Sequence, residues 1–294
     1  MNLEEYFSRI QYSGTYSKAD LVTLNQLHEQ HLRFIPYENL SIHCGEKIVT
    51  DLEACYNKIV RKKRGGWCSE NNSVFAWVLK KLGYDVTLLA ACVYDIEKKA
   101  YSDRMSHMII KVVINGNTYI ADVGFSSSRQ IRQPLELTSG KDQPQIPGVF
   151  RLTEESGVWY LDKISRKKSV HHQSFHGLPL LENNENSNRV VKIYRFTLEP
   201  YSTEQLQLNC IYLQTSPESL FTKKSICCLQ THDGVQTLVG WTYGEVTYKY
   251  EEDMDLITFK TLTDEEVKNT VKEKFGIVLE KKLVPANNAA HILV

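Results

Sequence analysis

The spacing of apolar residues changes at Gly83, and this change limits the fold more than any other feature of the sequence. Before Gly83, apolar side chains recur at helical spacing, as in the run Leu52, Cys55, Tyr56 and Ile59. After it, short runs rich in β-branched and aromatic residues, such as "DVTLLAACVYD" and "HMIIKVVI", are separated by turn residues. The sequence therefore predicts an α+β fold, with helices first and an antiparallel sheet or barrel after them.

Helix boundaries and hairpin turns are also marked in the sequence. Thr50 and Glu53 have the form of a capping box, and Thr263 and Glu266 have the same form near the C-terminus. The first box predicts a helix that runs to Arg64 and stops at the two following glycines. Asp233-Gly234 predicts a hairpin between two strands of the last part of the chain.

We expect three units along the chain: a helical bundle over residues 1–83, a β-barrel over 84–200, and an α/β unit over 201–294. A polar stretch over about 164–189 shows no clear period and is interpreted as a surface insertion in the barrel. It contains His171, His172 and His176, but no fourth ligand at a plausible spacing. Solvated loop histidines are therefore expected there, and no metal site.

Composition excludes several classes of function. The 294-residue chain has 35 Lys+Arg and 35 Asp+Glu, so no overall basic field favours nucleic acid or an anionic membrane as a partner. No apolar run approaches the roughly 20 residues that cross a bilayer, and the segment "MNLEEYFSRI" has no signal-peptide core. Seven cysteines without a CxxC pair argue against a disulfide framework or a zinc site. We expect a cytoplasmic protein with free thiols.

Cys68 is the cysteine with the most suggestive surroundings. It follows "RGGW", and Val74, Phe75 and Val78 continue at helical spacing behind it, which places Cys68 at a helix N-terminus. The positive end of the helix dipole favours a thiolate there. The two glycines are expected to let the backbone turn tightly and a substrate approach closely. The alternative is that Cys68 is an ordinary buried thiol that fills space.

A nucleophilic thiolate needs a base, and a hairpin further along can supply one. Asn115-Gly116 is a favoured two-residue turn, which pairs Ile114 with Asn117. Counted outward from this turn, His107 and Asp122 lie on the same face of the hairpin, diagonal to each other and within hydrogen-bond reach. A one-residue slip in register would separate them. The alternative is that each residue caps backbone at a strand end.

These residues resemble the Cys-His-Asp triad of the arylamine N-acetyltransferases. The segments "RFIPYENLSIHCG", "QPLEL", "SGKDQPQIP", "FRLTEE", "YLQTSP" and "KKLVP" are similar, in order and spacing, to vertebrate members of that family, and the resemblance covers nearly the whole chain. It implies that Cys68 is the nucleophile, His107 the base and Asp122 the residue that orients it. It also implies a helical bundle, a central barrel and a C-terminal α/β lid around a core like that of cysteine proteases and transglutaminases.

The resemblance further implies the substrates. Acetyl-CoA would be the donor co-substrate, without a metal, and the acceptors would be aromatic amines, arylhydrazines and, by transfer to oxygen, N-hydroxyarylamines. Asp103 and Arg104 would lie near the CoA phosphates, and Tyr212 would contact CoA. The residues expected to shape the acceptor pocket are Ser106, His107, Phe125, Ser127 and Arg129.

We make two further predictions about the residues of the acceptor pocket. Phe125 and Ser127 are expected on one face of a strand, with Phe125 narrowing the pocket. Arg129, at the end of the strand, would favour acceptors with a carboxylate if it points into the pocket; the alternative is a solvated arginine that does not affect specificity. We expect a monomer that acts in xenobiotic metabolism.

The sequence allows two other interpretations of these residues. A Cys-His-Asp triad also serves cysteine hydrolases and transglutaminase-like acyl transferases, which would turn over esters or glutamine peptides without CoA. A protein that binds CoA or xenobiotics with an inactive triad is the non-enzymatic alternative. An acetyl adduct on Cys68 after incubation with acetyl-CoA would distinguish these readings.

Overall fold

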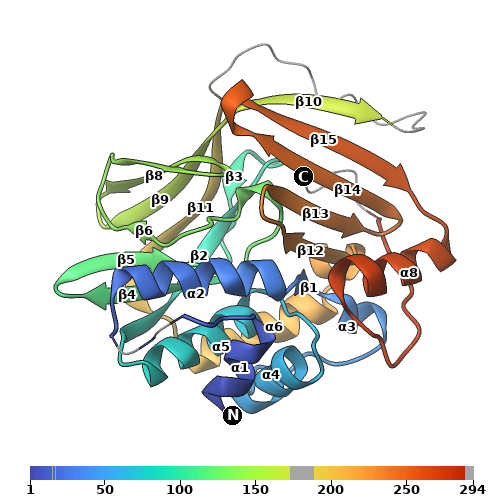
Figure 1. The fold of residues 1–294 in the computed structure, drawn as a ribbon, viewed down its shortest axis with the longest axis horizontal. Coiled ribbons are helices and arrows are strands. Elements are labelled where there is room, and N and C mark those ends of the chain that lie inside the picture. Colours follow the sequence, from blue (N-terminus) through green and yellow to red (C-terminus); the bar gives the residue numbers. More distant parts are fainter. Residues whose placement is uncertain (15, 17, 173–188, 289–294) are drawn as a thin grey trace.

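The computed structural model describes residues 1–14, 16, 18–172 and 189–288. Its first part is helical, as predicted, and lies at the bottom of Figure 1. The elements before Gly83 are α1 (Leu3–Arg9), α2 (Leu21–Phe34), the short strand β1 (Tyr37–Glu38), α3 (Leu40–His43), α4 (Leu52–Tyr56), the π-helical turn η1 (Asn57–Arg61) and α5 (Cys68–Lys81).

The start of α4 differs from the sequence prediction by one residue. Asp51, and not Thr50, is the N-cap, and its side chain accepts a hydrogen bond from the backbone N–H of Ala54 at 2.8 Å. Aspartate is the stronger N-cap of the two residue types, which accounts for the difference. The box predicted near the C-terminus is confirmed, because Thr263 caps the helix α8 (Asp264–Phe275) and the side chain of Glu266 accepts from the N–H of Thr263.

A strongly bent antiparallel sheet forms the barrel on the left of Figure 1. Its strands run in the order β6-β5-β4-β2-β11-β9-β8-β7, with β3 paired to β2. Gln143 on β7 links the two end strands, since its side chain donates to the carbonyl of Glu136 on β6 at 3.0 Å and accepts from its N–H at 2.8 Å. The barrel elements are β2 (Asp85–Asp95), β3 (Ala100–Tyr101), β4 (His107–Ile114), β5 (Asn117–Ala121), the 3-10 turn η2 (Ser127–Arg129), β6 (Leu135–Glu136), β7 (Asp142–Gln145), β8 (Gly148–Glu155), β9 (Val158–Ser165) and β11 (Arg189–Pro200).

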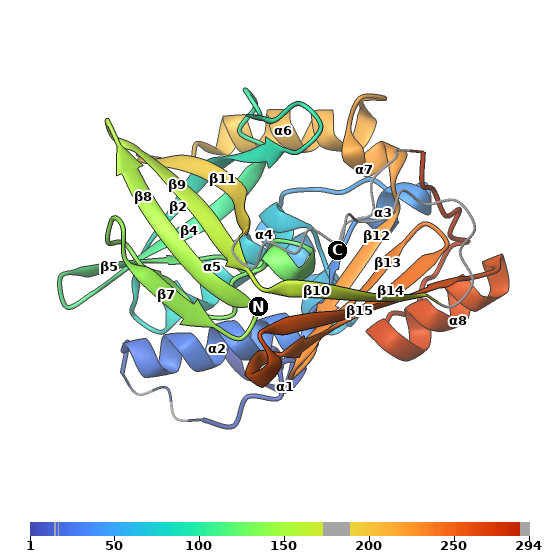
Figure 2. The ribbon, with the colours of Figure 1, turned by 90° about the horizontal axis from the view of Figure 1, so that it is seen from above.

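A second, mixed sheet lies to the right of the barrel in both Figure 1 and Figure 2. Its order is β1-β12-β13-β14-β15-β10, with β10 (Lys167–His172) parallel to β15 and the other pairs antiparallel. The predicted hairpin at Asp233-Gly234 is confirmed between β12 and β13. The elements after β11 are α6 (Thr203–Thr215), α7 (Leu220–Lys223), β12 (Ile226–Gln230), β13 (Gly234–Val239), β14 (Thr242–Lys249), the 3-10 turn η3 (Tyr250–Glu252), β15 (Met254–Thr261) and α8 (Asp264–Phe275).

The polar stretch over 164–189 is not one irregular insertion. Its first residues belong to β9, Lys167–His172 form β10, and Arg189 begins β11. The sequence prediction was wrong for these positions because the pairing of β10 with β15 joins segments far apart in the chain, which no local period reveals. The side chains of His171 and His172, and the whole of His176, lie outside the described residues.

Apolar burial brings three parts of the chain together at the start of α5. The helix packs its inner face, which includes Val74, Phe75 and Val78, against α2 and β4. Trp67 precedes the helix and Cys68 is its first residue. These two side chains pack instead with side chains of α6 and of the second sheet. Helices, barrel and second sheet thus meet around Cys68, and the predicted α+β fold is confirmed.

Candidate active site

Cys68 lies at the first residue of α5 and is 5% exposed. The side chain of Glu70 accepts a hydrogen bond from the backbone N–H of Trp67 at 3.1 Å, which closes the first turn of the helix. The predicted position of Cys68 at a helix N-terminus is therefore confirmed.

The glycines before Cys68 are needed for close packing. A Cβ on Gly65 would lie 2.0 Å from the carbonyl oxygen of Pro36, and one on Gly66 would lie 2.6 Å from the Cβ of Glu70. Neither glycine has a left-handed backbone. The glycines therefore meet a packing constraint, which fixes the chain leading to Cys68 against the segment before β1, and the expected close approach of substrate stays a prediction.

Four charged side chains lie beneath this helix start: Glu38, Arg64 and Glu70 are buried, and Lys58 is partly buried. Lys58 donates to both carboxylate oxygens of Glu70, at 2.8 and 2.9 Å, and lies 3.7 Å from Glu38. Arg64 binds Glu38 through two nitrogens, at 3.0 and 3.1 Å. Burial raises the pKa of Glu70, and the charge of Lys58 offsets only part of this shift. The pairs hold Glu70 in place, and Glu70 holds Trp67.

The hairpin has the predicted register. Ile114 pairs with Asn117, and Ile110 pairs with Ala121. His107 begins β4 and Asp122 follows β5, so their side chains meet with the His107 Nε2 atom 2.7 Å from Asp122 Oδ2. Both residues are buried, at 3% and 1% exposed. The bond uses Nε2 and leaves Nδ1 of the same ring available to a second group.

The charges of the pair support each other. Burial would lower the pKa of His107, but the Asp122 carboxylate, and the neighbouring Cys68 thiol to a smaller extent, raise it to about 10. Burial would raise the pKa of Asp122, but His107 and the groups that donate to the carboxylate lower it. The site is therefore built to hold an imidazolium beside a carboxylate at neutral pH.

Asn72 and Gly124 hold the second oxygen of Asp122. The side-chain amide of Asn72 and the backbone N–H of Gly124 both donate to Oδ1, each at 2.9 Å. The side-chain oxygen Oδ1 of Asn72 accepts from the N–H of Val123 at 2.9 Å. Asn72 stands one helical turn after Cys68 on α5, so the same helix positions the thiol and the carboxylate.

Two aromatic side chains pack against the ring of His107. The ring centroids of Phe125 and Tyr194 lie 5.1 and 5.2 Å from that of His107, and 5.8 Å from each other. Phe125 is partly buried, and Tyr194 on β11 is fully buried. The predicted position of Phe125 next to the reacting groups is consistent with this contact.

Ser127 and Arg129 do not extend a strand. Strand β5 ends at Ala121, and Ser127–Arg129 form the 3-10 turn η2 with a left-handed φ of 71° at Ser127. The argument that Phe125 and Ser127 share a strand face was therefore wrong. The second sheet holds this turn instead, because the N–H of Ser127 contacts Cys228 Sγ at 3.1 Å and its carbonyl accepts from Gln230 at 3.0 Å.

Arg129 is a half-buried cation. In the described part of the chain no carboxylate forms an ion pair with it, and burial lowers the pKa of its guanidinium. Lys163 nearby is fully buried and donates to the carbonyl of Ser128 at 2.7 Å. Burial and the surrounding cations, Arg129 among them, lower the pKa of Lys163 to about 7.

Ser106 lies beside Cys68, whose Sγ is 3.8 Å from the carbonyl oxygen of Ser106. Both residues, with His107, line a small cavity of about 10 Å³, closed on the other side by Tyr201 and residues of α6. Asn209 of α6 and the Tyr201 hydroxyl both donate to the carbonyl of Met105, at 2.6 and 3.2 Å. The loop before His107 is thus tied to α6.

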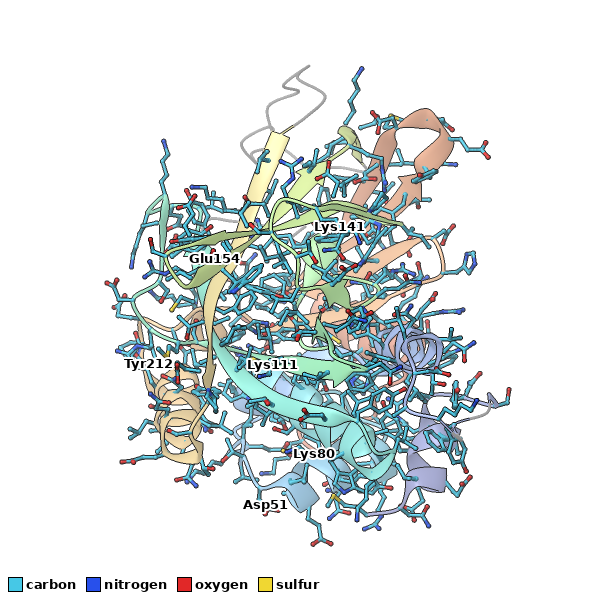
Figure 3. The ribbon with its side chains drawn as sticks, turned by 90° about the vertical axis from the view of Figure 1, so that its left-hand side faces the viewer. Asp51, Lys80, Lys111, Lys141, Glu154 and Tyr212 are labelled. Atoms are coloured by element: carbon cyan, nitrogen blue, oxygen red, sulfur yellow. The ribbon has the colours of Figure 1, made fainter. Side chains whose placement is uncertain are left out.

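Two of the residues expected to bind CoA contact each other. The Arg104 guanidinium lies over the ring of Tyr212, 3.8 Å from its centroid. Tyr212 lies on α6, at the edge of the molecule in the view of Figure 3. Asp103 and Arg104 are exposed. Asp103 and Arg104 belong to the loop that leads to Ser106 and His107, and Tyr212 contacts this loop from α6.

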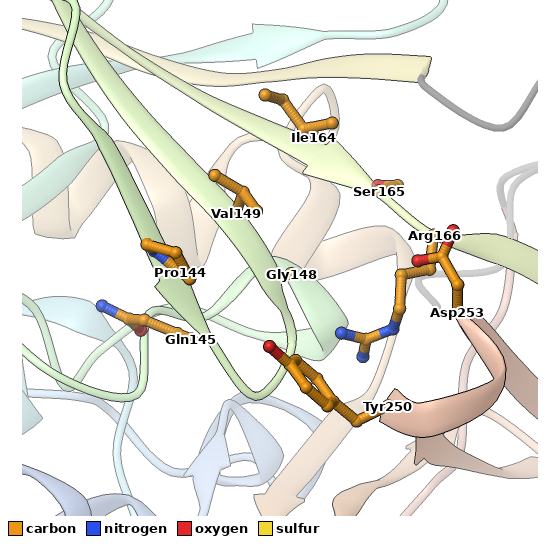
Figure 4. Close-up of a pocket in the computed structure, with 9 residues that line it drawn as sticks. All are labelled: Pro144, Gln145, Gly148, Val149, Ile164, Ser165, Arg166, Tyr250 and Asp253. Atoms are coloured by element: carbon orange, nitrogen blue, oxygen red, sulfur yellow. The ribbon is translucent and has the colours of Figure 1, made fainter.

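A larger pocket lies away from these residues. It has a volume of about 300 Å³ and includes Arg166, Tyr250 and Asp253 (Figure 4), and none of the predicted site residues line it. Within the described residues, no group of three or more His, Cys, Asp or Glu side chains could hold a metal ion, and none of the helices is both long and apolar enough to span a bilayer.

Sequence reasoning missed three residues of this site: Asn72, Tyr194 and His28, whose Nε2 accepts from the N–H of Asp122 at 3.1 Å. Two of them left a signal in the sequence. Asn72 comes four residues after Cys68, and His28 interrupts the apolar stripe of α2 with a polar side chain. Tyr194 left none, because its position depends on the pairing of β11 with β2.

Comparison with known proteins gives a consistent result. A family model described as N-acetyltransferase matches residues 20–284. The pineal gland isozyme NAT-10 of arylamine N-acetyltransferase from Gallus gallus is 55% identical over 98% of each chain. The solved arylamine N-acetyltransferase of M. smegmatis has a TM-score of 0.79 at 25% identity and covers 95% of this chain and 93% of its own. That of Mycobacterium marinum in complex with CoA has a TM-score of 0.77 at 23% identity, with 94% and 93% covered.

Proposed function

The chain belongs to the arylamine N-acetyltransferase family and is an arylamine N-acetyltransferase, and we propose that it passes the acetyl group of acetyl-CoA to aromatic amines through a thioester on Cys68. The observation that carries this assignment of roles is the buried His107–Asp122 pair, 2.7 Å apart, next to a cysteine at a helix N-terminus. Cys68 is the nucleophile, His107 the proton carrier and Asp122 the group that orients the imidazole.

In the first half-reaction the Cys68 thiolate attacks the carbonyl carbon of acetyl-CoA. The new C–S bond forms, the C–S bond to CoA breaks, and the CoA sulfur leaves with the proton that His107 held. One thioester replaces another, so the acetyl-enzyme is formed at little cost in free energy. The backbone N–H of Cys68, at the positive end of α5, is our candidate donor to the oxyanion.

In the second half-reaction the amine nitrogen attacks the acetyl carbon. An N–C bond forms, the bond to Cys68 breaks, and the nitrogen gives up a proton to His107, which restores the thiolate–imidazolium pair. Arylamines are largely unprotonated at neutral pH because the ring delocalises their lone pair. An alkylamine would arrive mainly as a cation with no lone pair to attack, so the pKa of the acceptor selects among amines. Arylhydrazines and, by transfer to oxygen, N-hydroxyarylamines meet the same requirement.

The CoA contacts are assigned to the loop before His107. Arg104 supplies a cation for the phosphates, and Tyr212 supplies an aromatic surface next to it, as their contact at 3.8 Å suggests. Asp103 lies beside them on the exposed side of the loop. Because this loop continues into Ser106 and His107, a donor bound there could extend its thioester toward Cys68.

The acceptor is assigned to the space bounded by Ser106, His107, Phe125, Ser127 and Arg129. Phe125 limits its width, and Arg129 offers a positive charge without a carboxylate partner among the described residues. Compact arylamines, and those with a carboxylate, are the preferred acceptors in this proposal.

The compartment and the oligomeric state are proposals of the same kind. All seven cysteines are free thiols, which agrees with a reducing cytosol. We propose a cytoplasmic monomer that uses small molecules as its only partners.

Intact mass spectrometry after incubation with acetyl-CoA tests the function. One acetyl group should appear on the native chain and none on Cys68→Ser, and addition of 4-aminobenzoate should remove it. Double-reciprocal plots for the two substrates should be parallel. Hydrolysis of the adduct at the same rate with and without amine would favour a cysteine hydrolase, and intersecting plots would exclude a double-displacement reaction.

A further inference from the structure

His28 on α2 connects two backbone groups next to the proposed triad. Its Nε2 accepts a hydrogen bond from the N–H of Asp122 at 3.1 Å, and its Nδ1 donates to the carbonyl of Arg132 at 2.9 Å. Both bonds are satisfied only by the neutral ring with its proton on Nδ1. Burial lowers the pKa of His28 to about 4, so this is the form present at neutral pH.

The same helix carries a second histidine in a closely similar setting. His28 and His31 are both 0% exposed, and their rings meet Phe75 edge-on at 5.8 and 5.4 Å between centroids. His31, however, bonds to the hydroxyl of Tyr6 through Nδ1, and its Nε2 has no partner among the described residues. The two residues therefore share packing and burial but differ in their contact with Asp122.

We propose that His28 is a positioning residue for the triad, which sets the main chain of Asp122 so that its carboxylate meets His107. This inference rests on the proposed roles of Cys68, His107 and Asp122. The side chain of Asp122 is held by Asn72 and Gly124, but neither contact fixes its own peptide N–H. His28 does so from the opposite side, across the layer between α2 and the barrel.

The position of the Asp122 main chain affects both the carboxylate of Asp122 and the backbone of Phe125. Gln130 donates to the carbonyl of Asp122 and accepts from the N–H of Phe125 at 2.8 Å. A shift of Asp122 would therefore move the carboxylate away from His107 and disturb the backbone of Phe125. An apolar residue at position 28 would also leave the N–H of Asp122 buried without an acceptor, which favours such a shift.

The test compares His28→Leu with His31→Leu, which remove equally buried imidazoles from one helix. We would measure the rate of acetyl-Cys68 formation at saturating acetyl-CoA, the KM for 4-aminobenzoate, and the titration of the His107 ring by NMR in ¹⁵N-histidine-labelled protein. His28→Leu should slow acetyl-Cys68 formation at least tenfold and lower the pH at which His107 loses its proton. His31→Leu should change the rate less than twofold and leave the titration unchanged.

His28→Gln supplies the conservative control, because its amide can accept from the N–H of Asp122 and should restore most of the rate. The proposal is overturned if both leucine variants have the same effect, or if folded His28→Leu keeps the native rate and the native His107 titration. If His28→Leu does not fold, a His28→Gln variant that lacks the native titration overturns it equally, and one that keeps it supports it. Should the native chain form no acetyl-Cys68, the proposed function fails, while the titrations still measure the effect of His28 on His107.

Discussion

A Cβ atom on Gly124 would lie 2.6 Å from the Cα of Cys68 and 2.9 Å from its carbonyl oxygen. The backbone after β5 therefore runs directly against the first turn of α5, at a distance that only glycine allows. The same Cβ would lie 2.7 Å from the side-chain nitrogen of Asn72, which bonds to Asp122. One contact thus sets the separation between the thiol and its partners on the hairpin.

We predict that Gly124→Ala destabilises the fold by about 1–3 kcal/mol, since backbone atoms must move to admit the methyl group. Acetyl transfer should fall much further than stability, because the shift changes the distance from Cys68 to His107. Urea unfolding and kcat/KM measure the two effects. Gly45→Asn is the control, because its left-handed φ of 68° suits asparagine and nothing lies within 4 Å of its Cβ. A Gly124→Ala chain with native kcat/KM would show that this contact does not set the geometry.

The His107–Asp122 pair leads to a prediction about titration. His107 should keep its proton until about pH 10, because Asp122 outweighs burial. In Asp122→Asn the ring of His107 stays buried but loses the carboxylate that raises its pKa. The pKa of His107 should therefore fall below the ordinary value of an imidazole. We expect kcat to fall by about 10³–10⁴-fold. NMR titration of the ring and steady-state rates measure both. A native ring that titrates near its ordinary value would contradict the proposed charge pair.

The same shift makes stability depend on pH. The pKa of His107 is higher in the folded than in the unfolded chain, so its stabilisation is complete below about pH 6.5 and is lost as the pH rises to about 10. Over that window the free energy of unfolding should fall by up to about 1.4 kcal/mol per pH unit from this group. Asp122→Asn should remove this slope, and the difference between the two urea-unfolding series isolates it. Parallel series would exclude a proton held by His107 in this window.

Lys58 gives a prediction about the charges beneath Cys68. Its ammonium group lies 2.8 Å from Glu70 and 3.7 Å from Glu38, and its side chain is 16% exposed. Lys58→Met keeps the aliphatic stem but leaves Glu70 buried without its cation, so we expect a loss of about 3–5 kcal/mol in urea unfolding. The loss should shrink as the pH falls and Glu70 takes up a proton. Lys62→Met, which removes an exposed partner of Glu280, should change stability little. Equal losses in the two variants would argue against a buried network.

The sequence was sufficient for those parts of the site that local rules determine. The turn at Asn115-Gly116 fixes a two-residue loop, and this set the register that joins His107 to Asp122. Helical spacing likewise placed Cys68 at the start of α5. The path of the chain after Asp122 was not predictable in this way. The turn at Ser127 is held by Cys228 and Gln230, about 100 residues later in the chain.

A similar limit applies to the packing around the site. The contact of Tyr194 with His107 requires the pairing of β11 with β2, and the strand at Lys167–His172 exists because β15 lies beside it. Neither pairing leaves a periodic signal in the local sequence. The glycines before Cys68 were noticed correctly, but the reason for Gly65, its contact with Pro36, also lies outside its own segment.

Choice of acceptor leads to the last prediction. Arg129 is half-buried and has no carboxylate partner within the described residues, and burial lowers the pKa of its guanidinium. A para-carboxylate on an arylamine would supply that partner. Arg129→Ser should therefore lower kcat/KM for 4-aminobenzoate about tenfold or more relative to 4-methylaniline, since a charge-assisted hydrogen bond contributes about 1.5–3 kcal/mol. A ratio of the two values that does not change would show that Arg129 does not contact the acceptor.

In the same assay, Phe125→Ser separates the effect of pocket width from the effect of the charge on Arg129. The ring of Phe125 lies edge-on to His107 at 5.1 Å, so its removal should open space next to the acetyl group. We expect kcat/KM for a polycyclic amine such as 2-aminofluorene to rise relative to 4-methylaniline, while the ratio of 4-aminobenzoate to 4-methylaniline stays close to native. If both ratios changed together, Phe125 would act by holding the turn that carries Arg129 and not by limiting the width of the pocket. If neither changed, the acceptor would approach Cys68 along a path that Phe125 does not border.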